Sequence, residues 1–229
     1  MFDTELLERI FWEPLSSGAD HLLIISGYAT PNMASWFFKN IEKKTEKKID
    51  ISLIVGMVPY DGLSISIHEG FKSLVNSANL PAEVGSFSCS YVCENAPVHA
   101  KLYIWLKETT PMRAFIGSAN FTQSAFGRER REVMTECDLQ EALAYYNKIE
   151  QDTVYCNHGE IKDQIVLHAT HPILDEENNL VGSITGQDIH LLRFHSFHAQ
   201  AMLGKNLDLT GGRGENAIRM KRISRCLPK

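Results

Sequence analysis

Two short apolar runs separated by a helical segment constrain the fold of this chain more than any other feature. His21 to Ser26 reads HLLIIS and Ile49 to Val58 is a second buried run, each of a length typical of a strand. Between them, a segment that begins at Pro31 carries apolar residues at helical spacing and ends in a run of lysines and glutamates. A strand, a helix and a strand in this order form a βαβ unit with two parallel strands. The sequence therefore predicts an α/β fold.

Further elements follow from the same periodicities. Residues 4 to 13 have apolar positions at helical spacing, and Pro14 is expected to end that helix. The remaining pattern predicts helices over 65–77 and 139–151 and strands over 82–91 and 133–138.

The stretch from Val98 to Thr122 places several polar residues on a predicted hairpin. His99 and Lys101 are two residues apart, so in a strand both side chains point to the same face. A polar turn and a second apolar run follow, ending in a segment that contains Ser118 and Asn120. The hairpin would bring these two residues beside His99 and Lys101.

An imidazole, an ammonium and a carboxamide together favour chemistry at phosphorus. The imidazole can attack a phosphorus atom or transfer a proton, while the other two hold the phosphate oxygens. The segment carries no carboxylate cluster for a divalent metal, so the implied chemistry needs neither metal nor cofactor. A His-x-Lys pair alone is common, and a histidine in a strand usually serves packing. The pair gains meaning from the GSANF segment that follows it.

His99-x-Lys101 followed by Gly117-Ser118-Ala119-Asn120-Phe121-Thr122 resembles the HxK…GSxNxT signature of the phospholipase D superfamily. Within it, the chain is most similar to the NgoFVII-type restriction endonucleases, and three further stretches carry this closer resemblance: residues 25–29, 53–57 and 131–134. The resemblance covers roughly the first two thirds of the chain. It implies a phospholipase D-like mixed sheet flanked by helices, with a short C-terminal appendage, and a hydrolase that cleaves DNA.

The resemblance also implies roles for individual residues. Many members of the superfamily have an aspartate five residues after the motif lysine, where this chain has Leu106. In the restriction-type branch a downstream glutamate serves instead, and Glu132 matches it best, with Glu129 and Glu136 close by as solvated alternatives. Glu132 would orient and polarise a histidine, and Ser118 would assist phosphate binding.

A phospholipase D site uses two HxK motifs, and this chain contains one that is followed by a GSxN segment. The resemblance therefore implies a homodimer with twofold symmetry across the motif face. One His99 would form a phosphohistidine and the other would protonate the leaving oxygen, while Lys101 and Asn120 from both chains hold the non-bridging oxygens.

The expected substrate is double-stranded DNA, although the formal net charge of −5 does not by itself indicate nucleic-acid binding. Arg128, Arg130 and Arg131 lie just after the motif and either hold backbone phosphates or form a solvated loop. A companion ATPase, helicase or methyltransferase is a further possible partner. Two alternatives stay open: a lipid phosphodiesterase or phosphatidyl transferase, and a DNA-binding module that has lost catalysis.

The composition predicts a cytoplasmic protein without a membrane partner. The five cysteines have no regular spacing, which suits a reducing compartment, and no apolar run has the length of a membrane span. We expect a catalytic domain over 1–155 and, over 156–229, a linker or an incomplete DNA-recognition region. The basic end, 209–229, either contacts nucleic acid or is disordered. This last part does not resemble the recognition domain of the similar enzymes, so the chain is expected to be truncated or to end in another reading frame.

Overall fold

The computed structural model describes residues 1–45, 47–76, 78, 80–127, 131–174, 180–185, 206–208 and 218–221. The chain divides into two compact units, which are described separately: unit 1 comprises residues 1–63 and 67–166, and unit 2 comprises 64–66 and 167–229. Arg128, Glu129, Arg130 and most of the basic end lie outside the described residues.

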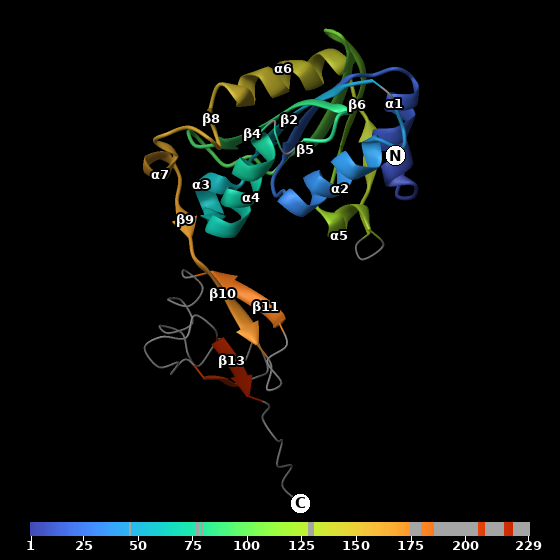
Figure 1. Ribbon diagram of the computed structural model, residues 1–229. Helices are drawn as coiled ribbons and strands as arrows, with labels where there is room; N and C mark the ends of the chain where they lie inside the picture. Colours follow the sequence, from blue (N-terminus) through green and yellow to red (C-terminus); the bar gives the residue numbers. More distant parts are fainter. Residues whose placement is uncertain are drawn as a thin grey trace, which may run out of the picture. The chain divides into compact units, whose positions relative to one another are not determined.

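Unit 1 is built on a seven-stranded mixed sheet with the order β7-β6-β5-β1-β2-β4-β8 (Figure 1). The strands are β1 (His21–Ser26), β2 (Ile49–Val55), β4 (Val84–Val92), β5 (Lys101–Lys107), β6 (Thr110–Gly117), β7 (Met134–Glu136) and β8 (Thr153–Tyr155). β2 lies parallel to β1 and to β4, whereas β5 lies antiparallel to β1 and to β6. The predicted α/β class, the parallel pair and the hairpin are confirmed.

Helices cover both faces of this sheet. They are η1 (Glu8–Trp12, π-helical), α1 (Glu13–Ser16), α2 (Pro31–Ile41), α3 (Val58–Asp61), α4 (Ile65–Val75), α5 (Gln123–Phe126), α6 (Leu139–Glu150) and α7 (Ile161–Gln164), and a short strand, β3 (Leu63–Ser64), precedes α4. In Figure 1, α6 covers one face, and α2, α4 and α5 lie on the other. The β1 and β5 strands are therefore buried on both sides, which explains why their sequences are almost continuously apolar.

The alternation of side chains along β5 decides which face each residue serves. Leu102 belongs to the core cluster that also contains Tyr146 of α6. Tyr103 faces the other way and packs edge-on against Phe11, with ring centroids 5.6 Å apart. Because side chains alternate with a period of two, Lys101 lies on the Tyr103 face of the sheet.

The N-terminal helix is longer than the sequence pattern predicts. Pro14 was expected to end it, but helical structure continues through α1 to Ser16, so that prediction is wrong. Pro14 lies in the first turn of α1, and the carbonyl oxygen of Ile10, four residues earlier, accepts instead from Trp105 Nε1 at 2.6 Å.

Unit 2 contains a four-stranded sheet with the order β11-β10-β13-β12. Its strands are β10 (Thr170–Leu174), β11 (Leu180–Thr185), β12 (Asn206–Asp208) and β13 (Ile218–Lys221), and β9 (Leu167–His168) precedes them.

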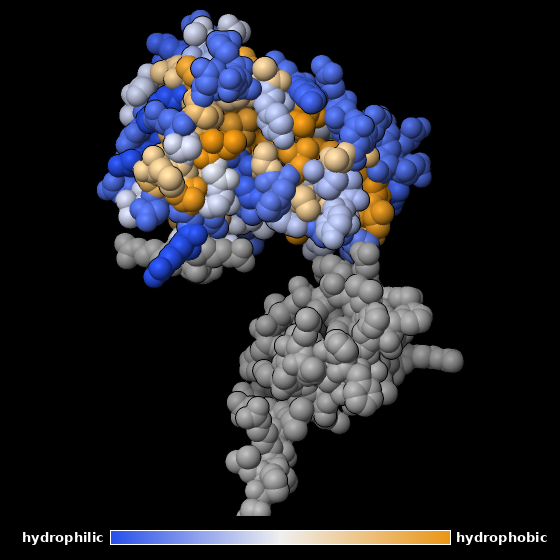
Figure 2. Space-filling view, turned by 180° about the vertical axis from the view of Figure 1, so that it is seen from behind, coloured by the Kyte–Doolittle hydropathy of each residue, from blue (hydrophilic) through white to orange (hydrophobic). Residues whose placement is uncertain are grey.

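The surface of unit 1 seen in Figure 2 is mostly hydrophilic, with smaller hydrophobic areas between the polar residues.

Candidate active site

Two glycines at the ends of parallel strands allow the segment with His99 to cross the edge of the sheet. A Cβ atom on Gly56 would lie 2.0 Å from the carbonyl oxygen of Val98, and one on Gly27 would lie 2.9 Å from Cδ2 of His99. The Val98 N–H donates to the Gly56 oxygen at 2.9 Å, and the Gly27 N–H donates to the Ala100 oxygen at 3.1 Å. Main-chain bonds therefore hold the exposed His99 at the carboxyl ends of β1 and β2, just before β5 begins.

Lys101 is the first residue of β5, and its side chain is only 5% exposed. Its Nζ donates to the carbonyl oxygen of His99 at 2.6 Å, which gives the buried ammonium an acceptor. Burial lowers the pKa of Lys101, and the nearby charge of Glu132 acts in the opposite direction. The structure thus places an ammonium group directly beneath the main chain of the candidate nucleophile.

The carboxamide of Asn120 has a defined orientation. Its Oδ1 accepts a hydrogen bond from the Tyr28 main-chain N–H at 3.1 Å, and Ser26 Oγ lies 3.3 Å away. Because a main-chain N–H can only donate, the atom that faces it must be the amide oxygen. Nδ2 makes no hydrogen bond to the described residues, so the amide group keeps both donor hydrogens for a ligand.

Ser26 is a residue of this site that the sequence patterns did not identify. It is fully buried at the end of β1, donates from Oγ to the Tyr28 carbonyl oxygen at 2.6 Å and accepts from the Phe121 N–H at 2.9 Å. It ties the end of β1 to the loop that carries Asn120. The available signal was a serine at the end of an otherwise apolar strand, because a buried hydroxyl group needs hydrogen-bond partners.

Ser118 and Glu132 form a pair beside this group. Ser118 Oγ donates a short hydrogen bond to Glu132 Oε2 and accepts one from the Val133 N–H at 3.0 Å. Gly117 permits this close approach, since a Cβ there would lie 2.1 Å from the Val133 oxygen. Within the described residues Glu132 makes no hydrogen bond to His99, so its expected role in orienting a histidine stays a prediction.

The other candidates lie apart from this group or outside the described part of the chain. Glu136 and Glu13 both pair with Arg113, the latter at 2.8 Å, so Glu136 belongs to an ion-pair network on β6 and β7. Leu106 is buried in the core. Arg131 is exposed. Arg128, Arg130 and Glu129 are not described, so their roles stay predictions.

Tyr28 is an exposed aromatic ring next to His99. The two ring centroids are 5.9 Å apart with an interplanar angle of 77°, and Tyr28 Oη donates to Asp61 Oδ2 at 2.5 Å. This hydrogen bond, together with partial burial and the charge of Asp61, raises the pKa of Tyr28 to about 12. The phenol therefore stays protonated at any physiological pH.

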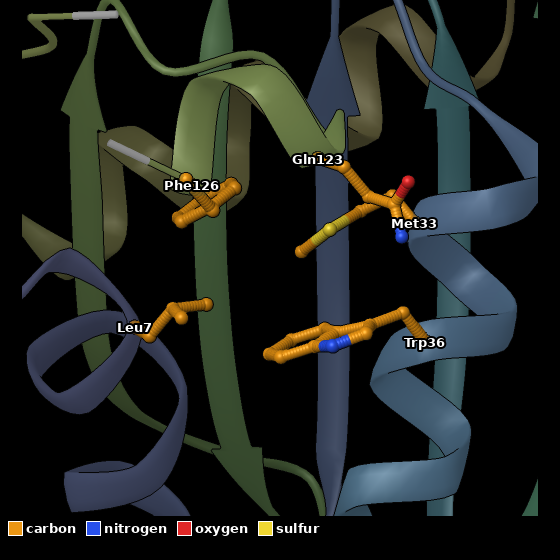
Figure 3. Close-up of a pocket in the computed structure, with 6 residues that line it drawn as sticks. Leu7, Met33, Trp36, Gln123 and Phe126 are labelled. Carbon is orange, nitrogen blue, oxygen red and sulfur yellow. The ribbon is translucent and has the colours of Figure 1, made fainter. Parts of the chain in front are cut away.

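A hollow of about 200 Å³ lies between α2, α5 and the N-terminal helix, away from these residues. Leu7, Met33, Trp36 and Phe126 point into it (Figure 3), and Gln123 and Gly127 also line it. Its lining has no ionisable side chain and contains none of the motif residues. The hollow is therefore separate from the motif residues at the edge of the sheet.

The described residues contain neither a membrane-spanning helix nor a metal-binding cluster. None of the helices in the described part of the chain is long and apolar enough to cross a membrane. No group of three or more histidine, cysteine, aspartate or glutamate side chains there is arranged to hold a metal ion.

Several solved structures are similar to this chain, whereas no curated protein matches its sequence. NucT from Helicobacter pylori has 16% identity and a TM-score of 0.42, covering 67% of this chain and 96% of its own. Nuc from Salmonella typhimurium, a phospholipase D family member, has 11% identity and a TM-score of 0.44, covering 63% and 86%. Polyphosphate kinase from Porphyromonas gingivalis has 14% identity and a TM-score of 0.38, covering 69% and 24%.

The sequence comparison with protein families is more decisive. The family described as the NgoFVII restriction endonuclease N-terminal PLD domain matches residues 4–163, where PLD denotes phospholipase D. The matched range includes every motif residue discussed above and the whole seven-stranded sheet. The chain therefore belongs to the family of the NgoFVII restriction endonuclease N-terminal PLD domain.

Proposed function

We propose that this protein is a DNA endonuclease of the restriction type that hydrolyses phosphodiester bonds without a metal ion. The family supports a nuclease. The observation that carries the proposal is the meeting of three groups around the end of β1: the exposed His99, the buried ammonium of Lys101 and the oriented amide of Asn120. These are a nucleophile and two hydrogen-bond donors, which suit a phosphate group whose charge increases during attack.

The reaction would proceed in two displacements. His99 of one subunit attacks the phosphorus and forms a P–N bond, while the P–O bond to the leaving nucleoside breaks. His99 of the partner subunit gives its proton to the leaving oxygen. The neutral imidazole then takes a proton from water, and the resulting hydroxide attacks phosphorus and breaks the P–N bond. Lys101 and Asn120 donate to the non-bridging oxygens throughout.

A homodimer would supply the second histidine. Two aliphatic side chains beside the site are unusually exposed: Ile116 at 41% and Val133 at 37%. Ile116 lies two residues before Ser118 and Val133 directly follows Glu132, so both are close in sequence to the pair formed by Ser118 and Glu132. Burial of these side chains would favour association, and twofold symmetry would place the two His99 residues in one site.

The proposed substrate is double-stranded DNA. The exposed Arg131 lies directly beside Glu132 in sequence, and its guanidinium group suits a backbone phosphate. Arg128 and Arg130 are assigned the same role by their place in the sequence. A companion ATPase, helicase or methyltransferase remains part of this proposal, as does a cytoplasmic location.

Cleavage of supercoiled plasmid in excess EDTA tests the proposal. We expect the wild type to cut and His99→Ala to lose cleavage while it still binds the plasmid, because the nucleophile is removed and the donors remain. His158→Ala is the matched control, since His158 is an exposed histidine outside the site, and it should cut like the wild type. Cleavage by His99→Ala at the wild-type rate would refute the mechanism. Binding without cleavage by the wild type would indicate a module that has lost catalysis.

A further inference from the structure

Two exposed tyrosines lie on the side of the site formed by β1 and α3. Tyr28 is 42% exposed and Tyr60 is 74% exposed. Tyr60 directly precedes Asp61 in α3. Single exposed aromatic residues are common on protein surfaces. Tyr28 differs from the exposed Tyr60, Tyr145 and Tyr155 in that its ring contacts the ring of the candidate nucleophile.

The ring of Tyr28 is held at both ends. Its hydroxyl group donates to Asp61, and its main chain bonds to Asn120 through the N–H and to Ser26 through the carbonyl oxygen. A side chain fixed before binding loses little conformational freedom when a ligand packs against it. Tyr28 therefore presents an aromatic surface at a fixed place beside His99.

The charge on this side of the site indicates which part of a nucleic acid it would contact. The Asp61 carboxylate accepts the Tyr28 hydrogen bond, and it would repel a phosphate group placed over the ring. The ammonium group of Lys101, which favours phosphate, is bonded to the carbonyl oxygen of His99 and not to Tyr28. The neutral part of a nucleotide, its base, is thus the group that fits against Tyr28.

We propose that Tyr28 stacks on an unpaired nucleobase that adjoins the phosphate attacked by His99. The inference rests on the proposed function and narrows its substrate: the nucleotide next to the cut must be out of the duplex stack. Base stacking on aromatic side chains is tolerant of sequence, because every base has a π face. In a duplex, the site would engage a nucleotide that has been extruded or is already unpaired.

A double-mutant cycle between ring and base tests this. The probes are a single-stranded oligothymidylate and an abasic oligomer with the same number of phosphates, each bound to the full chain carrying His99→Ala, at one salt concentration in EDTA. We expect Tyr28→Ala to raise the Kd for oligothymidylate about tenfold, the loss of one stacking interaction, and to leave the Kd for the abasic oligomer unchanged. Tyr28→Phe keeps the ring and should bind oligothymidylate nearly as the parent does.

Tyr155→Ala is the matched control, because Tyr155 is 56% exposed on β8, and it should change neither Kd. If Tyr28→Ala does not fold, Tyr28→Leu takes its place: it keeps a large apolar side chain without a π face and should show the same loss specific to oligothymidylate. Equal losses on both oligomers, or none on either, would overturn the stacking proposal. In that case, plasmid cleavage by the wild type would still support the proposed nuclease. A loss specific to oligothymidylate in a chain whose wild type cuts no DNA would instead refute the nuclease and keep the stacking site.

Discussion

Asn120 shows how a single side chain becomes specific for a ligand through its neighbours. The oxygen and the NH₂ group of a side-chain amide are similar in size, so the amide can bind in two orientations. Here the main-chain N–H of Tyr28 donates to Oδ1 of Asn120 and selects one of them. Ser26 stabilises that arrangement by accepting from the Phe121 N–H and donating to the Tyr28 carbonyl oxygen. In the proposed site, this arrangement leaves the donor end of Asn120 for the substrate phosphate, while Ser26 acts only through its bonds to Tyr28 and Phe121.

Removal of the Ser26 hydroxyl group should therefore impair turnover more than binding. We expect Ser26→Ala to lower kcat roughly 10- to 100-fold with a smaller effect on KM, because the donor of Asn120 loses its alignment with the reacting phosphate. Ser26→Thr retains a hydroxyl group and should restore part of the rate. Steady-state kinetics on a cleavable oligonucleotide separate the two constants. If Ser26 had a purely structural role, Ser26→Ala and Ser26→Thr would both yield less folded protein. The folded fraction of each variant would then have the KM and the kcat of the wild type.

The buried Lys101 predicts an alkaline limit to activity. Burial lowers its pKa from the ordinary 10.5, and Glu132 raises it. As pH rises through the lowered pKa, the ammonium loses its proton and its charge, so activity should fall with increasing pH. Glu132→Gln removes the opposing charge, lowers the pKa further and should move this limb to lower pH. The dependence of the cleavage rate on pH over the alkaline range measures this shift. If the fall in rate stays at the same pH in Glu132→Gln, or moves to higher pH, Glu132 does not raise the pKa of Lys101 in the way proposed.

At the scale of elements, the site depends on where strands end. The βαβ unit and the hairpin were predictable, because HLLIIS and the run after Ile49 are apolar and a polar turn follows β5. The expectation that His99 lies within a strand was not met, since β5 begins at Lys101 and His99 precedes it. The crossing of 98–100 over the ends of β1 and β2 depends on tertiary hydrogen bonds, which a one-dimensional pattern does not contain. For the same reason, Ser26 was assigned to the strand and not to the site.

Gly56 is the element-scale position most sensitive to substitution. A methyl group there would overlap the Val98 oxygen, so Gly56→Ala must separate the end of β2 from the segment before His99. We expect a loss of at least about 2 kcal/mol in the free energy of unfolding, as for other overpacked interior sites. Urea unfolding followed by circular dichroism measures it. Gly159→Ala is the control, because no atom lies within 4 Å of a Cβ at Gly159, and it should unfold like the wild type.

At the scale of the whole molecule, the proposed dimer predicts a dominant effect of the inactive chain. When wild type and His99→Ala are co-expressed and purified together, each mixed dimer lacks one of its two histidines. Plasmid cleavage should then fall with the square of the wild-type fraction. Mixing with His158→Ala should cause no loss. A linear decrease with the fraction of His99→Ala would show that each chain acts alone.

The order of the site segments along the chain also has a consequence for biosynthesis. Ser26 ends β1 and Tyr28 follows it two residues later, Lys101 begins β5, and Glu132 comes just before β7. When the ribosome has translated the first half of unit 1, the nascent chain therefore contains the ends of β1 and β2 but does not yet contain Asn120. The full set of groups exists only after β7 has left the exit tunnel. The complete site therefore forms only when synthesis of the domain is nearly finished.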